Sequence, residues 1–435
     1  MYWETDVKRE WRTIRYPNER FQRIHAANKE IELEQSVLEY YGPLKLGNTE
    51  PGIPFISKDR NLRVNAIGKQ LAEGDYDVVS LQEVWSNDDF EYIRKVTQNS
   101  LPFSHYFHSG VVGSGLCILS KYPITMTLFH SWSVNGYVHR IQHGDWFGGK
   151  GVGLCQIMVQ NRPINIYIAH LHAEYDRNCD DYKAHRVIQS FDTAQFIEST
   201  RGDSILQVLA GDLNTEPGDL AHRLLLSTAK LTDTCDNSIP TCDNPTNSYT
   251  PQSTKDSLPT GKRIDYILYR AGRDCQANVL DYKLPLSHSI PDHPISFSDH
   301  EAVYSRIQIT LPQSPFPDSS NFNFNNDDNG LVTALNEAIE ICQDNLEKLR
   351  SHKTIYFTMA LAVMMTLFYL IDMVPPYGLQ TMFTVLRVIV SGLALFFLFM
   401  ATLWNSMEAN GILAGKLAME ISLRNAESEK AIDRS

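Results

Sequence analysis

Hydrophobic and polar positions divide the chain into a long mixed region and a strongly apolar end. Between about residues 60 and 310, apolar residues recur either at helical spacing or in short runs bounded by turn residues. This pattern predicts helices at residues 61–71 and 181–200, and strands at residues 77–81, 115–119, 151–159, 164–169, 205–210, 264–269 and 302–309. Strands outnumber helices and some connections are too short for parallel crossovers, which favours a mixed α/β sandwich.

Two nearly continuous apolar runs follow at residues 355–374 and 379–404. Each could cross roughly 30 Å of hydrocarbon as a helix, whereas a helix in a soluble core would show a polar stripe. Pro375 and Pro376 separate the runs, and tandem prolines end a helix. The second run carries one charge, Arg387, which could snorkel to the interface. The pattern predicts a two-helix membrane hairpin.

The charges around these runs predict how the hairpin is oriented. Lys and Arg lie before the first run and after the second, and the turn has neither. The positive-inside rule therefore places residues 1–353 and 405–435 in the cytosol. Seven cysteines without a CxxC pair fit reduced cytosolic thiols. The modest span lengths favour the endoplasmic reticulum or another internal membrane.

These boundaries predict the domain organisation of the 435-residue chain. We expect a charged extension at residues 1–43, a folded domain at 44–311, a flexible linker at 312–330, a pre-membrane helix at 331–353, the two spans, and a cytosolic helix or tail at 405–435. The net charge of −12 argues against a protein that binds nucleic acid, because such proteins usually present a basic face.

Polar residues cluster at the ends of the predicted strands. They are Glu83 in SLQEVW, His170 and His172 in AHLHAEY, Asp212 and Asn214 in AGDLN, Asp265 in KRIDYILY, and Asp299 and His300 in SDHEAV. Each one alone is typical of a turn or a surface loop. Five such sites in one domain predict a functional site, because converging strand ends are where these folds present function.

The residue types at these sites indicate the chemistry. Carboxylates could hold a hard cation such as Mg²⁺, histidines could transfer protons, and an asparagine could donate to an oxyanion. No HExxH zinc signature and no GxSxG elbow occur. The segment GDWFGGKG at residues 144–151 matches GxxxxGK, but Gly151 replaces the hydroxyl residue that a nucleotide loop requires. We expect instead a substrate-side loop with Asp145 and Lys150, and metal-assisted attack of water on a phosphate ester.

The motifs LQEVW, HLHAEY, GDLN, RIDYILY and SDHEAV, in that order, resemble the endonuclease/exonuclease/phosphatase superfamily of DNase I-like fold. Segments at residues 52–60, 113–124, 143–154 and 170–177 resemble its neutral sphingomyelinases. The resemblance implies an α+β fold, a four-layer sandwich of two sheets flanked by helices. It also implies Mg²⁺-dependent hydrolysis of sphingomyelin, or a related sphingophospholipid such as ceramide phosphoethanolamine, to ceramide and the phosphorylated head group at a membrane.

The resemblance also implies a role for each motif residue. Glu83 corresponds to the Mg²⁺ ligand, His300 to the general base, and Asp265 to the acid that orients this base. His170 and Asn214 correspond to the phosphate contacts, and Asp212 to substrate recognition and leaving-group handling. Asp145 and Lys150 correspond to a pair that switches the site between closed and open arrangements. Asp299 and Asn48 are further metal candidates.

The resemblance fails at the first strand of the family. That strand normally ends in Asn two residues before a Trp, where this chain has Thr49 and Pro51, with Asn48 one residue early. The preceding IELEQSVLEYYGPLKLG looks more helical than strand-like. Two alternatives therefore stay open: another phosphodiesterase of the superfamily, such as a nuclease or phosphoinositide phosphatase, and a catalytically weak membrane adaptor.

Overall fold

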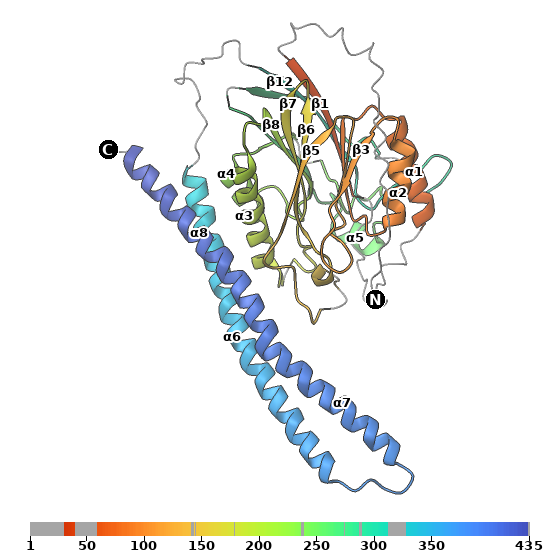
Figure 1. Ribbon diagram of the computed structural model, residues 1–435, viewed down its shortest axis with the longest axis vertical. Helices are drawn as coiled ribbons and strands as arrows, with labels where there is room; N and C mark the ends of the chain where they lie inside the picture. The colour runs from red at the N-terminus through yellow and green to blue at the C-terminus, as the bar shows by residue number, and fades with distance from the viewer. Residues whose placement is uncertain are drawn as a thin grey trace, which may run out of the picture.

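The computed structural model describes residues 59–140, 143, 145–177, 179–235, 239–273, 275–286, 289–311 and 328–433, together with the backbone of residues 30–39. The region around Asn48 and nearly all of the predicted linker at 312–330 lie outside these residues. Within them, two six-stranded sheets form the centre of the molecule, and a long helical hairpin extends from one side (Figure 1).

The first sheet has the strand order β11-β12-β1-β2-β4-β3. Its strands are β1 (Glu30–Glu39), β2 (Val78–Gln82), β3 (Phe103–Tyr106), β4 (Cys117–Ser120), β11 (Gln276–Lys283) and β12 (Val303–Thr310). Helices α1 (Arg60–Glu73) and α2 (Asn87–Thr97) cover its outer face, where Ile67 and Ile93 pack with Val79 and Leu81 of β2.

The second sheet has the order β5-β6-β7-β8-β10-β9. Its strands are β5 (Ile124–Ser131), β6 (Gly151–Val159), β7 (Arg162–His170), β8 (Leu206–Asp212), β9 (Thr232–Asp233) and β10 (Asp265–Ala271). Helices α3 (Lys183–Thr200) and α4 (Leu220–Ala229) lie on its outer face. A short helix, α5 (Gln252–Ser257), lies in the connection to β10.

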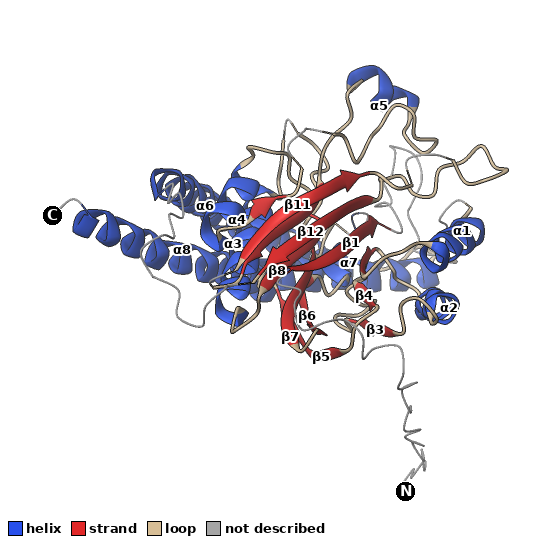
Figure 2. Ribbon diagram, turned by 90° about the horizontal axis from the view of Figure 1, so that it is seen from above, coloured by secondary structure: helices blue, strands red, loops and turns tan. Residues whose placement is uncertain are grey.

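The main apolar core lies between the two sheets, which Figure 2 shows from above. Val78, Ile118 and Ile307 of the first sheet meet Ile166 and Val208 of the second in this core. Together with the outer helices this gives four layers, so the predicted four-layer DNase I-like sandwich is confirmed. The helices and strands predicted from the apolar pattern are all present, with ends that differ by up to two residues.

Strand β1 contradicts the helix that the sequence suggested over the first part of residues 31–47. It pairs antiparallel with β12 and parallel with β2, so it lies inside the first sheet. The sequence alternates Glu30, Ile31, Glu32, Leu33 and Glu34, a strand period, but Glu and Leu are strong helix formers and this misled the prediction. The boundary expected at residue 44 is therefore wrong, since it leaves out a strand of the sandwich.

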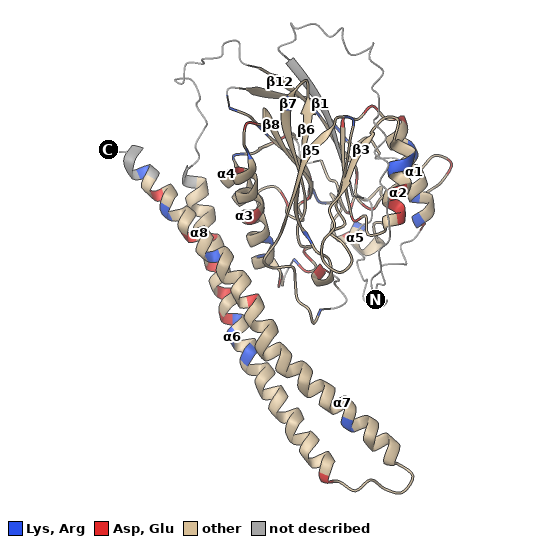
Figure 3. Ribbon diagram, viewed as in Figure 1, with Lys and Arg blue, Asp and Glu red and all other residues tan. Residues whose placement is uncertain are grey.

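The C-terminal region forms three helices, α6 (Asp328–Asp372), α7 (Gln380–Phe399) and α8 (Asn405–Asp433), with a π-helical turn at Met400–Trp404 between the last two. The most apolar 18-residue windows are only 6% and 11% buried. Figure 3 shows almost no charge on the far part of this hairpin. A soluble core helix would bury such a surface, so both segments are long, apolar and exposed enough to cross a membrane.

Arg387 reaches toward the turn end of the hairpin. Its guanidinium donates to the carbonyls of Leu370 at 2.7 and 2.9 Å and of Met373 at 2.9 Å, at the end of α6. It therefore satisfies helix-end carbonyls that hydrocarbon could not solvate.

The hairpin helices also pack against the sandwich. Leu335 and Ala338 of α6 and Ile412 and Met419 of α8 share one buried cluster with α3 and α4. A Cβ at Gly411 would lie 2.7 Å from the carbonyl oxygen of Ser133, so this glycine permits close approach. The Nε2 of His185 on α3 lies 2.6 Å from a carboxylate oxygen of Glu408 on α8, and both side chains are buried. Sandwich and hairpin are thus fixed to each other.

Candidate active site

Five strand ends bring the predicted polar residues to one edge between the sheets. β7 runs parallel to β8 and β10 antiparallel, so the register places His170 and Asp265 directly beside Asp212. Apolar residues of the same face, such as Ala210 and Ile168, belong to the core between the sheets. Side chains alternate along a strand, so His170, Asp212 and Asp265 point to the same face of the sheet as these core residues. They are the last residues on that face before the strands end.

Close strand spacing at this edge depends on the glycine before Asp212. A Cβ at Gly211 would lie 1.9 Å from the carbonyl oxygen of Ala169 on β7. No other residue fits there without moving the backbone, which explains the Gly-Asp pair in the AGDLN motif.

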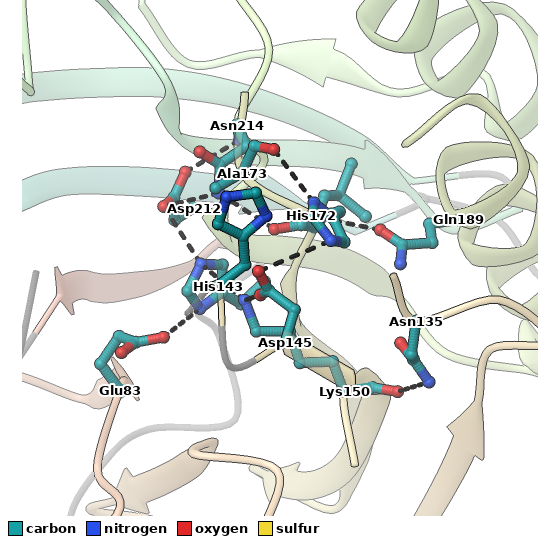
Figure 4. A network of polar contacts seen from close by, with 12 residues as sticks. Glu83, Asn135, His143, Asp145, Lys150, His172, Ala173, Gln189, Asp212 and Asn214 are labelled. Carbon is teal, nitrogen blue, oxygen red and sulfur yellow. Dashed lines mark hydrogen bonds and ion pairs between the residues drawn. The ribbon is translucent and has the colours of Figure 1, made fainter. Parts of the chain in front are cut away.

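His170 lies at the centre of the site and is almost completely buried. Its Nδ1 is 3.1 Å from a carboxylate oxygen of Glu83, and its Nε2 is 3.4 Å from Asp212 and 3.3 Å from the Lys150 ammonium. Figure 4 shows Glu83, Asp212 and Lys150 converging from different elements. One imidazole therefore connects the two sheets and the loop before β6.

Glu83 reaches the site through an unusual backbone conformation. Val79 and Leu81 of β2 face the outer cluster, so an extended residue 83 would point away from the second sheet. Glu83 instead has a φ of 60°, a region that costs a non-glycine residue of order 1–3 kcal/mol. The indole Nε1 of Trp85 donates to its carboxylate at 2.6 Å and fixes the new direction. Such strain is typical of functional sites.

The acid–base cluster consists of Asp212, Asp265 and His300. The Nδ1 of His300 lies 2.9 Å from Asp265, and ligand atoms of all three residues lie within 4.8 Å of one another. Burial, together with the nearby Asp212, raises the pKa of the Asp265 carboxyl, although His300 offsets part of this rise. The arrangement can hold an imidazole in one orientation and stabilise a positive charge on it.

Asn214 is held beside this cluster by short local contacts. Its amide nitrogen donates to Asp212 at 3.1 Å and to the Leu171 carbonyl at 3.0 Å. Its backbone N–H donates to the other Asp212 oxygen at 2.8 Å, and its φ of 44° is left-handed. Asn214 and His300 both line a small pocket, together with Tyr175 and Lys262.

A second group of side chains consists of Asp145, Lys150, His172 and Tyr175, and we call it the clamp. The Asp145 carboxylate lies 2.8 Å from the Lys150 ammonium and 3.5 Å from His172, and accepts a 2.6 Å hydrogen bond from Tyr175. Asp145 belongs to a 3₁₀ turn at Asp145–Phe147 and Lys150 lies just before β6. Figure 4 shows Asp145 and Lys150 side by side beneath His172.

The environment of the clamp keeps Asp145 and Lys150 charged and His172 neutral. Burial alone would raise the pKa of Asp145, but His172, Lys150 and Tyr175 outweigh it and hold that pKa well below its usual range. Burial likewise opposes the charge on Lys150, yet Asp145 and Glu83 raise the pKa of the ammonium. Burial lowers the pKa of His172 to about 3, so this imidazole is neutral near pH 7.

One predicted metal candidate, Asp299, lies away from these contacts. The carboxylate of Asp299 is 3.6 Å from the guanidinium of Arg63, and Asn48 lies outside the described residues. All other predicted site residues come together around His170. The sequence analysis did not assign roles to His172, Tyr175 and Gln82, although all three stand in the quoted motifs. The buried Gln82 amide has no hydrogen-bond partner among the described residues.

Comparison with known proteins agrees with this geometry. The Endonuclease/Exonuclease/phosphatase family matches residues 54–300. A Drosophila melanogaster protein named "Putative neutral sphingomyelinase" is 46% identical over 422 residues, covering 86% of this chain and 96% of that protein. Human "Sphingomyelin phosphodiesterase 2" is 39% identical over 268 residues, covering 59% of this chain and 62% of that protein.

Two more distant similarities complete the comparison. "Inositol phosphosphingolipids phospholipase C" of Schizosaccharomyces pombe is 31% identical over 290 residues, covering 61% of this chain and 68% of that protein. The crystal structure of sphingomyelinase C from Streptomyces griseocarneus is 18% identical, covers 63% of this chain and 99% of that chain, and has a TM-score of 0.45. On the family match and the sequence identities, the chain belongs to the endonuclease/exonuclease/phosphatase family and, within it, to the neutral sphingomyelinases.

Proposed function

We propose that this protein hydrolyses sphingomyelin, or a related sphingophospholipid such as ceramide phosphoethanolamine, to ceramide and the phosphorylated head group at a membrane surface. The observation that carries the proposal is the buried Asp265–His300 pair beside Asp212, whose His300 lines a pocket, on the same chain as two exposed apolar helices. Family membership supports a hydrolase of phosphodiesters.

His300 acts as the general base in this mechanism. With Nδ1 donating to Asp265 at 2.9 Å, Nε2 carries the lone pair that accepts a proton from the attacking water. The water oxygen bonds to phosphorus, the bond from phosphorus to the ceramide oxygen breaks, and the ceramide oxygen takes up a proton. Asp265 orients the imidazole and stabilises its charged form.

The donor set around His170 fits Mg²⁺. Four carboxylates of the site are buried: Asp145 is paired with the Lys150 ammonium, Glu83 and Asp212 contact the His170 imidazole, and Asp265 contacts His300. Hard oxygen ligands are those that Mg²⁺ prefers, and uncompensated buried carboxylates are costly. Glu83 is the proposed ligand, with Asp299 and Asn48 as lesser candidates. Bound there, Mg²⁺ would supply Lewis-acid stabilisation of the phosphate charge.

His170, Asn214 and Lys150 are the proposed contacts for the phosphate. All three have nitrogen donors at the centre of the site, and donors aimed at developing charge lower the barrier of a charged transition state. Asp212 lies between His170 and Asn214, where it can recognise the substrate and assist the leaving oxygen. Asp145 keeps Lys150 in place, and separating the pair would open the site.

The pocket beside His300 favours a cationic head group. Its lining includes Glu174, Glu216, Asp219 and Asp243 against Lys262. Arg186 and Arg177 pair with Glu174 and Glu216, which leaves Asp219 and Asp243 against Lys262. This lining is still acidic, so it attracts a choline or ethanolamine nitrogen and repels the additional phosphates of a phosphoinositide. This weighs against the phosphoinositide alternative, and the net charge of −12 weighs against a nuclease.

The adaptor alternative rested on the altered first strand. β1 pairs with both of its neighbours, so the sheet retains a strand at this position. The Asp265–His300 pair and the Asp145–Lys150 pair are also both formed. Both observations favour an enzyme.

The direct test is head-group release from sphingomyelin in mixed micelles by the full-length chain, with Mg²⁺ and with EDTA. We expect release that requires Mg²⁺ and a weaker reaction on phosphatidylinositol phosphates. Release that EDTA leaves unchanged would contradict the metal assignment, and no release in either condition would favour the adaptor.

The catalytic sandwich is proposed to lie in the cytosol, anchored by the hairpin in the endoplasmic reticulum or another internal membrane. Flanking Lys and Arg residues support this orientation. In sealed microsomes, added protease should digest the sandwich without detergent. Replacement of residues 357–399 by a Gly-Ser linker should release the protein from carbonate-washed membranes. Protection from protease would indicate the opposite orientation. Retention of the linker variant after the wash would contradict the assignment of the hairpin as the membrane anchor.

A further inference from the structure

The level at which a bilayer meets the sandwich follows from two aromatic residues of the hairpin. Tyr356 and Trp404 lie where the two apolar runs begin and end. The Trp404 ring packs edge-on against Tyr137 and His139, with ring centres 5.8 and 5.3 Å apart. The ring centres of Tyr356 and His139 lie 6.4 Å apart. Because the two apolar runs begin and end at these residues, the contacts place the loop of Tyr137 and His139 at the level where the hairpin enters the bilayer.

The same side of the sandwich carries exposed apolar residues. The exposed fractions are 81% for Val111, 43% for Val112 and 38% for Trp146. We call these three residues the interfacial patch. Figure 1 shows α6 and α7 continuing beyond the end of the sandwich where the short 3₁₀ turn that carries Trp146 lies.

The interfacial patch is built from two loops that are bonded to each other. The backbone N–H of Val111 donates to the Phe147 carbonyl at 3.3 Å, that of Gly149 donates to the Gly113 carbonyl at 3.0 Å, and Gly110 forms a β-bridge with Gly148. The loop between β3 and β4 and the 3₁₀ turn therefore move as one unit. Single exposed apolar residues need no explanation, but a joined group on one side of the molecule does.

The patch is also directly connected to the clamp. Trp146 follows Asp145 in the 3₁₀ turn, and Asp145 is buried against Lys150 while the Trp146 ring is turned outward. A contact made by Trp146 at the surface is therefore one residue away from the ion pair beside His170. The patch therefore adjoins the clamp.

We propose that the interfacial patch lies in the lipid interface of the bilayer that α6 and α7 cross, so that the site opens onto the membrane surface. The fixed packing of α6 and α8 on the sandwich holds the patch on the membrane side. Trp at an interface and valine side chains among lipid both gain free energy on leaving water. The occupant is thus the same membrane, and a protein partner is an outcome of the test.

The test measures lipid contact at Val111 without any catalysis. Cys179 is the exposed one of the seven cysteines, so a Cys179→Ser background with Val111→Cys allows one environment-sensitive label. The full-length protein is reconstituted in phosphatidylcholine vesicles with and without lipids that carry a quencher near the head group. We expect blue-shifted emission and at least threefold stronger quenching than at a label on Leu280→Cys.

Leu280 is the matched control because it is also an exposed apolar residue, but on edge strand β11. Leu361→Cys, on α6 within the first apolar run, is the positive control. Equal quenching at positions 111 and 280 would overturn the proposal. So would absent quenching at position 361, because the hairpin would then not lie in the bilayer.

A kinetic test separates the patch from the chemistry and rests on the proposed function. The variant Val111→Asp/Val112→Asp should raise the apparent KM for sphingomyelin in vesicles about tenfold, because two aspartates at the interface oppose lipid contact. Its kcat on a water-soluble phosphodiester should stay that of the wild type. An unchanged KM in vesicles would contradict the proposal, even if quenching were observed. If the wild type has no activity, the quenching experiment still decides the lipid contact.

Discussion

The acid–base cluster and the clamp are both buried groups of carboxylates beside nitrogen bases, yet they differ in support and in charge. Asp212 and Asp265 belong to paired strands, whereas Asp145 lies on a short turn. The acid–base cluster has two carboxylates around one imidazole, and burial raises the pKa of Asp265. In the clamp, Lys150 balances Asp145, whose pKa is held low. The first group suits proton exchange, and the second suits holding a fixed charge.

Removal of the general base should give the largest effect. We expect His300→Ala to lower kcat by about 10²–10⁴-fold, since a positioned base supplies acceleration of that size. Asp265→Asn should also lower kcat strongly, because an amide can donate to Nδ1 and favour the tautomer that has no lone pair on Nε2. Rates are measured on sphingomyelin micelles, and membrane attachment should not change.

The exposed His293→Ala is the control for this series, since this side chain lies in a surface turn. If His300→Ala retained a rate near that of the wild type, the acid–base cluster would have no part in proton transfer and the contrast with the clamp would fail.

Breaking the clamp should affect stability as well as rate. Lys150→Met leaves the Asp145 charge buried opposite an apolar side chain, and removal of one partner of a buried pair typically costs about 3–5 kcal/mol. The double variant Asp145→Asn/Lys150→Met should be considerably more stable than Lys150→Met alone. Thermal unfolding of the full-length protein in detergent measures both. Strictly additive losses would show that the two residues do not act as a pair.

The loss of folding stability at acid pH should report the protonation of His172. Its folded pKa of about 3 lies below the ordinary 6.5, so the unfolded chain binds a proton first as pH falls. His172 therefore destabilises the fold progressively between about pH 6.5 and pH 3, by at most about 1.4 kcal/mol per pH unit. Asp145, with its lowered pKa, acts in the same direction at the acid end, and Asp265 partly opposes both.

The variant His172→Asn keeps a donor toward the Ala173 carbonyl but cannot be protonated. It should lose less stability than the wild type between pH 6.5 and pH 4, measured as the shift in melting temperature. Identical acid profiles for the two proteins would remove His172 as a source of acid lability.

Most of the site was predictable from the sequence because its residues end strands with clear apolar patterns. His170, Asp212 and Asp265 follow or begin such strands, and register alone then makes them neighbours. Glu83 was found by its motif only. The alternation along β2 would turn its side chain outward, and the left-handed backbone that reverses this has no signal in hydrophobic spacing.

Other features depend on tertiary contacts that no local pattern encodes. The partners of Asp145, namely His172 and Tyr175, come from the loop after β7. β1 was missed because its Glu and Leu residues favour helices, and pairing with β2 and β12 overrides that propensity. The hairpin was predicted by length and composition, but its packing on α3 through Glu408 was not.

The central claim is that this site directs water onto the phosphorus of a sphingophospholipid. The most direct test is turnover of sphingomyelin in water enriched in oxygen-18 with Mg²⁺, with mass spectrometry of both products. We predict one heavy oxygen in the released phosphocholine and none in ceramide, with both products lost in His300→Ala. Heavy oxygen in the ceramide hydroxyl, or products formed equally by His300→Ala, would contradict the account.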